Sequence, residues 1–402
     1  MQRNATIGIV GVVVVSALVV GIGATALGNP AASARPSTVA QVPTATPAPT
    51  TSGTPEATVE PTASPSPTPA PTPTPVPTPV TVPGALTGRP LSPAVAKRHP
   101  IAVMIDDLGA ARPQSGLSSA SVVWQAPAEG GIPRYMAIFQ DSLPKEIGPV
   151  RSSRYYYIAW AAEWRAVYAH AGGSPQAKAT LAAKGRGQYV YNIDEFRYSG
   201  TFGRVTFRSA PHNLYTTGAK LRAAGKHQGS KDKAYTAAWT FAPDAPLDAR
   251  PVGGTITIKY PYNTIGYSYD RKTNTYLRSV TGEKKETDKG TGVRIAPKNV
   301  VVMRMRFGPL NDGHPGAPRL EATVVGSGPA WVFTNGKTIK GTWKKTAITK
   351  PTRFYDKNGK AIPLTIGQTF VQVIPGNYPF TYKAGTNPPP AGTTPSGSPA
   401  PS

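Results

Sequence analysis

The sequence has 402 residues, among them 45 prolines, 41 glycines and no cysteine. Without cysteine the chain has no disulfide, no thiol nucleophile, no cysteine-bound metal and no lipid-modified cysteine. The formal net charge is +24, and the first 85 residues contribute none of it, because two arginines there balance two glutamates. Such a positive field attracts anionic lipids and polymers, although it is equally compatible with a role in solubility alone.

The N-terminal segment predicts a membrane anchor. Residues 7–27, IGIVGVVVVSALVVGIGATAL, contain no charge. This length fits a spanning helix of about 20 apolar residues better than a signal h-region of about 7–15. We interpret residues 1–30 as a transmembrane anchor, with a signal cleaved at the A-x-A-like Ala32-Ser33-Ala34 as the alternative. Arg3 before the span predicts a single-pass cell-membrane protein whose later residues are extracytoplasmic.

Residues 31–85 alternate proline with threonine, alanine, serine and valine and carry few charges. Such a segment cannot bury a core and favours extended polyproline II structure. We predict a disordered stalk that separates the following residues from the membrane. The tail, residues 384–402, has a similar composition and is also predicted to be disordered.

Residues 86–248 mix strand and helix signals. Short β-branched and aromatic runs predict strands, and alanine-rich runs predict helices. We expect strands near 101–106, 121–127, 135–140 and 166–170, and helices near 152–165, 174–185 and 217–226. Ser174 stands at the position that caps the second helix, with proline directly after it. This part is predicted to form an α+β domain that carries the functional site.

Residues 249–383 alternate apolar and polar side chains with a period of two, which predicts antiparallel strands. Asn335-Gly336, with a strand on each side, is typical of a tight hairpin. The overall fold class is therefore α+β: a mixed α/β N-terminal domain followed by a smaller, mostly antiparallel β-rich domain.

Five blocks in the first domain combine charged or amide side chains with glycine or proline, as loops that hold functional residues often do. We expect these loops, at 104–117, 126–140, 147–158, 170–177 and 210–215, to converge on one cleft. The candidate ligand-binding residues within them are Arg112, Gln114, Glu129, Arg134, Arg151, Ser152, Arg154, His170, Ser174, Gln176, His212 and Asn213.

The sequence resembles the YerB-like lipoprotein family of bacteria. The resemblance covers about residues 86–380 and is carried by VMIDDLGAARPQSGL, AEGGIPRYMAIF, IGPVRSSR, HAGGSPQA, APHNLYT and GSGPAWVFTNGKTIKGTW, among others. It implies an α+β domain, a smaller β-rich domain and attachment to the membrane from outside, but no established reaction. Two departures stand out. A protein span must replace the lipid here, and Asp107 stands where the family pattern predicts asparagine.

The stretch IGPVRSSR precedes a predicted helix, and Ser152 or Ser153 is expected to cap that helix. Its two arginines need another explanation, because a cation near a helix N-terminus costs about 0.3–1 kcal/mol. Either an internal carboxylate neutralises Arg151 and Arg154, or an external anion binds there. Glu129 and Asp106 are the candidate carboxylates, and both solutions can coexist.

Three functions are compatible with these observations. The first is a binding module for an anionic cell-envelope ligand, such as peptidoglycan or an anionic wall polymer. The second is an envelope hydrolase or transferase, with Glu129 or Asp106 as acid or base and His170 or His212 as its partner. The third is a protein-interaction regulator of wall synthesis. An extracytoplasmic location argues against a nucleic-acid partner.

No cofactor or metal site is expected. The five histidines include no pair at i, i+4 spacing, and no P-loop or other nucleotide motif is present. Either histidine named above could instead be a buried structural residue.

Overall fold

The computed structural model describes residues 79–182, 189–313 and 318–387, which all lie in the second of two units, Pro75–Ser402. The predicted anchor or signal, nearly all of the predicted stalk and most of the predicted tail lie outside the described residues. Within the described ranges, no helix has the length and apolar character needed to cross a membrane.

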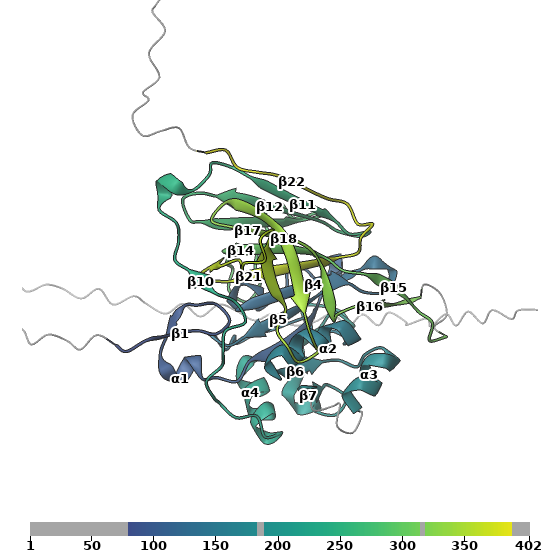
Figure 1. Ribbon diagram of the computed structural model, residues 1–402. Coiled ribbons are helices and arrows are strands. Elements are labelled where there is room, and N and C mark those ends of the chain that lie inside the picture. Colours follow the sequence, from purple (N-terminus) through teal and green to yellow (C-terminus); the bar gives the residue numbers. More distant parts are fainter. Residues whose placement is uncertain (1–78, 183–188, 314–317, 388–402) are drawn as a thin grey trace, which may run out of the picture. The chain divides into compact units, whose positions relative to one another are not determined.

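A ten-stranded sheet runs through this unit (Figure 1). In order across the sheet, the strands are β19 (Arg353–Asp356), β18 (Lys337–Lys345), β17 (Gly326–Thr334), β14 (Asn299–Arg304), β21 (Thr369–Ile374), β4 (Val122–Pro127), β5 (Pro133–Phe139), β3 (Ile101–Asp106), β6 (Val167–His170) and β7 (Tyr191–Asp194). The first five come from the second half of the chain, and the last five come from the first half.

The two halves meet where β21 pairs in parallel with β4, from Thr369↔Val122 to Gln372↔Gln125. Every residue of both strands is buried, as expected for strands covered on both faces. The α+β fold class is confirmed. The predicted division after residue 248 stays a prediction, because the shared sheet establishes only that both halves contribute to one layer.

One face of the ten-stranded sheet is covered by α2 (Tyr155–Ala161) and α3 (Pro175–Ala182). Alternate residues of β4 point toward these helices, among them Trp124, whose ring stacks on that of Trp160 at 4.7 Å. The core on this face continues across the second half to Trp343 of β18.

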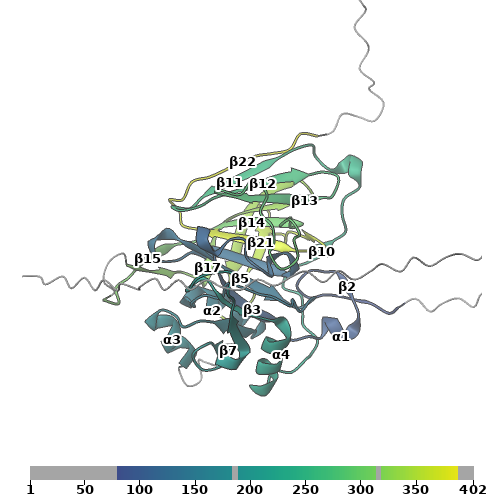
Figure 2. The ribbon, with the colours of Figure 1, turned by 180° about the vertical axis from the view of Figure 1, so that it is seen from behind.

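The opposite face has two covers. Over the second half lies an antiparallel sheet of β13 (Thr275–Val280), β12 (Thr264–Asp270), β11 (Thr255–Lys259) and β22 (Phe380–Lys383). Over the first half lie α4 (Gly218–His227) and the pair β8 (Phe202–Arg204) and β9 (Leu214–Thr216). Figures 1 and 2 show β11, β12 and β22 on the side of the central sheet away from α2 and α3.

Shorter elements connect these layers. The helix α1 spans Pro93–Ala96, and three further strand pairs are β1 (Val82–Pro83) with β2 (Pro90–Leu91), β10 (Phe241–Ala242) with β20 (Leu364–Thr365), and β15 (Phe307–Leu310) with β16 (Arg319–Ala322). The 3₁₀ turns are η1 (Gly109–Ala111), η2 (Leu117–Ser119), η3 (Glu129–Gly131), η4 (Ala162–Trp164), η6 (Ser199–Thr201) and η7 (Leu247–Ala249).

The predicted hairpin at Asn335-Gly336 is confirmed. It joins β17 to β18, with Thr334 paired to Lys337. Asn335 and Gly336 have φ of 50° and 71°, the left-handed values that a two-residue hairpin turn requires.

Candidate functional site

The polar loops of the first half meet where β3 ends and β5 begins. Asp106, the last residue of β3, pairs across the strands with Arg134 of β5. The loop at 147–154 runs beside them, because the Asp106 amide donates to the Pro149 carbonyl at 3.0 Å. The loop that follows β6 joins the same place, where the Ala171 amide donates to the Arg151 carbonyl at 3.1 Å.

Asp106 is held by partners on all sides and is 2% exposed. Its Oδ2 lies 2.7 Å from Arg151 Nε, an ion pair whose N–H direction departs from a straight hydrogen bond. His212 Nδ1 donates to the same oxygen at 2.7 Å. The Leu108 amide donates to Oδ1 at 3.1 Å, and the Gln114 side chain donates to the Asp106 carbonyl at 2.9 Å. His212 is thereby oriented by a buried carboxylate.

Glu129, in η3, forms a two-pronged ion pair with Arg154. Arg154 Nε donates to Oε1 at 2.5 Å, and Nη2 donates to Oε2. The third nitrogen, Nη1, donates to the Ser153 carbonyl at 2.6 Å. Burial by itself would raise the pKa of Glu129, but the hydrogen bonds and charge of Arg154 outweigh it and hold that pKa below its ordinary value.

Arg134 has no such partner. Its Nη1 donates to the Ser152 carbonyl at 3.1 Å, and no carboxylate of the described residues lies within 4.0 Å of it. Burial, followed by the nearby charge of Arg154, lowers the pKa of Arg134 to about 10. The group stays charged at neutral pH, and its depressed pKa reflects first its burial and then the charge of Arg154, which nearby acidic groups only partly offset.

We refer to these groups together as the strand-end cluster. It brings three guanidinium groups and one imidazole to two carboxylates. Its members are Asp106, Glu129, Arg134, Arg151, Arg154 and His212.

The predicted serine cap of α2 is wrong. The helix begins at Tyr155, Arg154 is its N-cap residue, and no side chain caps it. Ser153 Oγ instead pairs with the Tyr168 hydroxyl at 2.7 Å, and Ser152 contributes its carbonyl to Arg134. The reason is that the preceding backbone is extended and bonded to neighbouring loops. The prediction of an internal counter-charge is confirmed: Glu129 serves Arg154, and Asp106 serves Arg151.

His170 and Ser174 fix the loop after β6. His170 is fully buried, with Nδ1 2.8 Å from the Gly172 carbonyl and Nε2 2.7 Å from Asn192 Oδ1. With both ring nitrogens occupied, it is poorly placed to exchange protons with a substrate. Ser174 Oγ accepts from the Ala177 amide at 3.2 Å and caps α3, as predicted.

The comparisons decide the family. Residues 86–231 match the family described as "Protein of unknown function (DUF3048) N-terminal domain", and residues 256–371 match its C-terminal domain. The chain belongs to the DUF3048 family.

A curated relative named "Putative lipoprotein YerB", from Bacillus subtilis (strain 168), is 32% identical over 299 residues, which are 72% of this chain and 85% of that protein. The crystal structure of YerB from Bacillus subtilis is similar in fold, with a TM-score of 0.66 and 28% identity over 75% of this chain and 99% of that one. The resemblance to YerB-like proteins is therefore confirmed, and the family is described as one of unknown function.

Besides His170 and Ser174, three predicted site residues make their contacts away from the strand-end cluster. Each is engaged by another side chain: Arg112 by Asp107, Gln176 by Glu321 and Asn213 by Arg204. The five loops of this DUF3048 protein thus converge, but only some of their polar side chains face the same place.

A buried polar network was not predicted. Arg278 of β13 is 0% exposed and pairs with Glu286, while it also donates to Gln125 of β4 at 2.9 Å and to the Tyr267 hydroxyl at 3.0 Å. Gln125 in turn donates to Asp107 at 2.6 Å. Burial raises the pKa of Asp107 to about 6 despite the opposing charges of nearby arginines.

One sequence signal could have revealed this network. Gln125 and Gln372 each interrupt an apolar strand, VVWQAP and TFVQVI, and the two residues are paired in the sheet. A polar side chain inside a fully buried strand requires a buried partner.

Proposed function

We propose that this DUF3048 protein is a membrane-anchored extracytoplasmic binding module for an anionic ligand of the cell envelope, held at the strand-end cluster. The observation that carries the proposal is Arg134. Its guanidinium has a backbone carbonyl as its hydrogen-bond partner, and its pKa is lowered by burial and by Arg154. An oxyanion beside Arg134 would relieve both conditions, because it would supply the missing charge and accept the free N–H groups.

The neighbouring groups favour a placed anion over a diffuse field. Arg154 and Arg151 are held rigidly by Glu129 and Asp106, so an arriving ligand does not have to order them. His212, beside Asp106, offers an additional donor when protonated.

The proposed location rests on the N-terminal sequence and on the relative. The Bacillus relative is named "Putative lipoprotein YerB", and this name supports attachment outside the cytoplasm. This chain has no cysteine, so we assign the anchor to the uncharged segment at 7–27 and the spacing from the membrane to the proline-rich stretch at 31–85.

A second candidate function is an envelope hydrolase or transferase. The supporting observation is the Asp106–His212 pair, in which a buried carboxylate orients an imidazole that is still 16% exposed. This arrangement leaves Nε2 available as a general base. A regulator that docks a partner through the β-rich half has less support, because the exposed large apolar residues described there lie apart along the sequence, at Val252, Tyr262, Val293 and Val325.

The test is co-sedimentation of the full-length chain, in detergent micelles, with purified cell-wall sacculi that retain or lack their anionic polymers. Arg134→Gln should weaken binding about tenfold, the value of one charge-assisted hydrogen bond. The matched control is Arg353→Gln, an exposed arginine on the edge strand β19, which should bind as the wild type does. The proposal is rejected if Arg134→Gln and Arg353→Gln lose the same amount of binding and if added salt weakens binding alike in both. That result would leave only a diffuse positive surface.

The same preparation separates the binder from the enzyme. If the strand-end cluster is catalytic, sacculi should release soluble fragments over time, and His212→Gln should abolish that release while binding persists. A binding module releases nothing in either form.

A further inference from the structure

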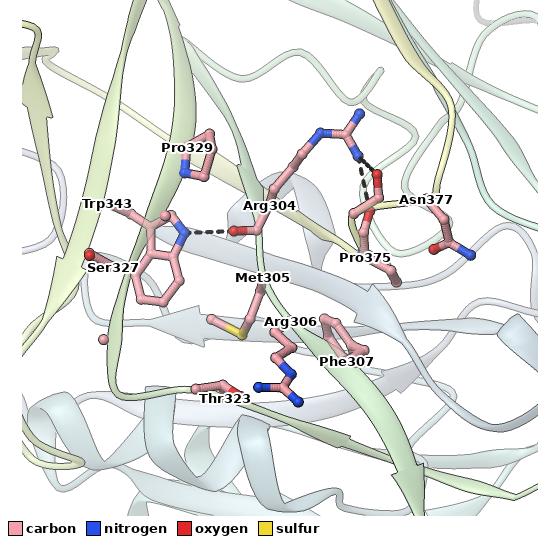
Figure 3. Close-up of a pocket in the computed structure, with 13 residues that line it drawn as sticks. Arg304, Met305, Arg306, Phe307, Thr323, Ser327, Pro329, Trp343, Pro375 and Asn377 are labelled. Carbon is pink, nitrogen blue, oxygen red and sulfur yellow. Dashed lines mark hydrogen bonds between the residues drawn. The ribbon is translucent and has the colours of Figure 1, made fainter.

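A groove whose lining includes two arginines lies in the second half of the chain, away from the strand-end cluster. It has a volume of about 650 Å³ and opens where β14, β17 and β18 approach the turn after β21. A neighbouring hollow of about 490 Å³ shares Arg306 and Thr323 with it, and so extends it toward Tyr155 at the start of α2. Figure 3 shows Arg304 reaching toward Pro375 and Arg306 reaching toward Thr323.

The groove wall is fixed by close packing. Trp343 Nε1 donates to the Arg304 carbonyl at 2.7 Å, a contact drawn in Figure 3. A Cβ added to Gly328 would lie 2.7 Å from that nitrogen and 2.9 Å from that carbonyl oxygen, so no larger residue fits there without displacement. Such a preformed wall is typical of ligand sites.

Arg304 is positioned without being neutralised. Its Nη1 donates to the carbonyls of Pro375 at 3.1 Å and Tyr378 at 3.3 Å, and also to that of Gly376. Carbonyl dipoles orient a guanidinium but do not cancel its charge, and no carboxylate of the described residues forms an ion pair with it.

Arg306 is exposed, and its guanidinium makes no hydrogen bond or ion pair within the described residues. Its carbonyl alone is engaged, by the Thr323 amide at 3.0 Å. Among the described residues, those that line the larger hollow include no acidic side chain. Glu321 lines the smaller one, and its carboxylate accepts from Gln176 at 3.1 Å. The larger hollow therefore presents two arginines without a counter-charge.

The rest of the lining indicates the kind of ligand. Ser327 and Asn377 are exposed, and neither side chain has a hydrogen-bond partner in the described parts of the chain. Beside them Met305, Phe307 and Pro329 supply apolar surface. Hydroxyl and amide groups over an apolar floor suit the hydroxyls and carbon faces of a sugar or polyol, and the arginines suit its oxyanions.

We propose that this groove binds a hydroxyl-rich polymer that carries oxyanions, either sugar carboxylates or backbone phosphates. The groove shares no residue with the strand-end cluster, so the proposal stands whether or not Arg134 binds an anion.

The test is titration calorimetry of the full-length chain in detergent with three probes: poly(glucuronic acid), poly(glycerol phosphate) and neutral dextran. We expect one or both charged polymers to bind and dextran not to bind, and the charged polymer that binds identifies the oxyanion. Arg306→Gln should weaken that binding about tenfold, and Asn377→Asp should also weaken it by placing a carboxylate opposite the polymer. Both side chains are exposed and make no hydrogen bond or ion pair within the described residues, so we expect both variants to fold.

Two controls keep the outcome clear. Arg353→Gln should bind as the wild type does. Arg306→Gln should cause the same fold-loss in the Arg134→Gln background as in the wild type, which separates this groove from the strand-end cluster. The proposal is overturned if neither charged polymer binds, or if Arg353→Gln and Arg306→Gln lose affinity equally.

Discussion

At the scale of single residues, Glu129 controls the charge balance of the strand-end cluster. It is the carboxylate that engages Arg154, and it also reduces the repulsion between Arg154 and Arg134. Glu129→Gln leaves both arginines without that charge, so we expect the free energy of unfolding to fall by about 2 kcal/mol at neutral pH. Urea unfolding measures this, with Glu321→Gln, an exposed carboxylate, as the control that should change little.

The pH dependence of the same pair has a definite sign. Because the pKa of Glu129 is lowered in the folded state, its contribution is present above its ordinary pKa of 4.5 and is lost as the pH falls through the lower folded value. The difference in stability between wild type and Glu129→Gln should therefore shrink below about pH 4. A difference that stays constant down to pH 2 would contradict the assigned ion pair.

The contribution of Asp107 to stability depends on pH with the opposite sign. Burial raises its pKa from 3.8 to about 6, so the folded state binds the proton more tightly than the unfolded state. Its contribution to stability is fully present below about pH 4 and is lost as the pH rises toward 6. Asp107→Asn removes this titration. We expect the stability of wild type relative to the variant to decline between those two pH values and then to level off. A relative stability that rises over this range would show that the arginines dominate instead.

At the scale of elements, the β17–β18 turn depends on glycine for two separable reasons. Gly336 has a φ of 71°, and a Cβ there would lie 2.4 Å from the Tyr269 ring. Gly359, just after β19, is the comparison site: its φ is 78°, and no atom of the described residues lies within 4 Å of where its Cβ would be. Gly359→Ala should thus cost about 1 kcal/mol from the backbone alone, and Gly336→Ala should cost clearly more in thermal unfolding. Equal costs would mean that the Tyr269 ring moves aside freely.

Local sequence predicted the elements better than their partners. Strand β3 coincides with the predicted residues 101–106, because the apolar run ends at its acidic residue. Helix α2 starts three residues later than predicted, since Ser153 is bonded to the loop after β6 and to Tyr168. The polar blocks predicted the loops that form the strand-end cluster. Both carboxylates named as candidate counter-charges, Glu129 and Asp106, do pair with its arginines. No local sequence pattern, however, predicts that Glu129 pairs with Arg154 and Asp106 with Arg151.

Long-range pairing was beyond the reach of sequence patterns. The pairing of β4 with β21 joins residues in opposite halves of the chain, and apolar alternation identifies strands without naming their neighbours. Arg304 and Arg306 were missed for a related reason. In a β-rich segment, charged residues at alternate positions predict a solvent-facing side of the strand. The groove forms only because the turn at Pro375 lies close to that side, and the local sequence does not show this.

At the scale of the whole molecule, a buried ion pair ties the two halves together. Lys345 of β18 donates to Glu163 of η4 at 2.8 Å, and both side chains are 0% exposed. Lys345 also donates to the Lys350 carbonyl at 2.5 Å, and Thr352 donates to Glu163 at 2.7 Å. Removing one member of such a pair leaves a buried charge without compensation, which typically costs about 3–5 kcal/mol.

Lys345→Met should therefore destabilise both halves, although the substitution lies in the second. Because β4 and β21 share one sheet and the Arg278 network spans its face, we expect the amides of β6 and of β14 to lose hydrogen-exchange protection to the same extent. The double variant Lys345→Met/Glu163→Leu should recover most of the stability, since it removes both charges at once. Loss of protection confined to β14 and its neighbours would instead mean that the halves on either side of residue 248 unfold independently, as separate domains would.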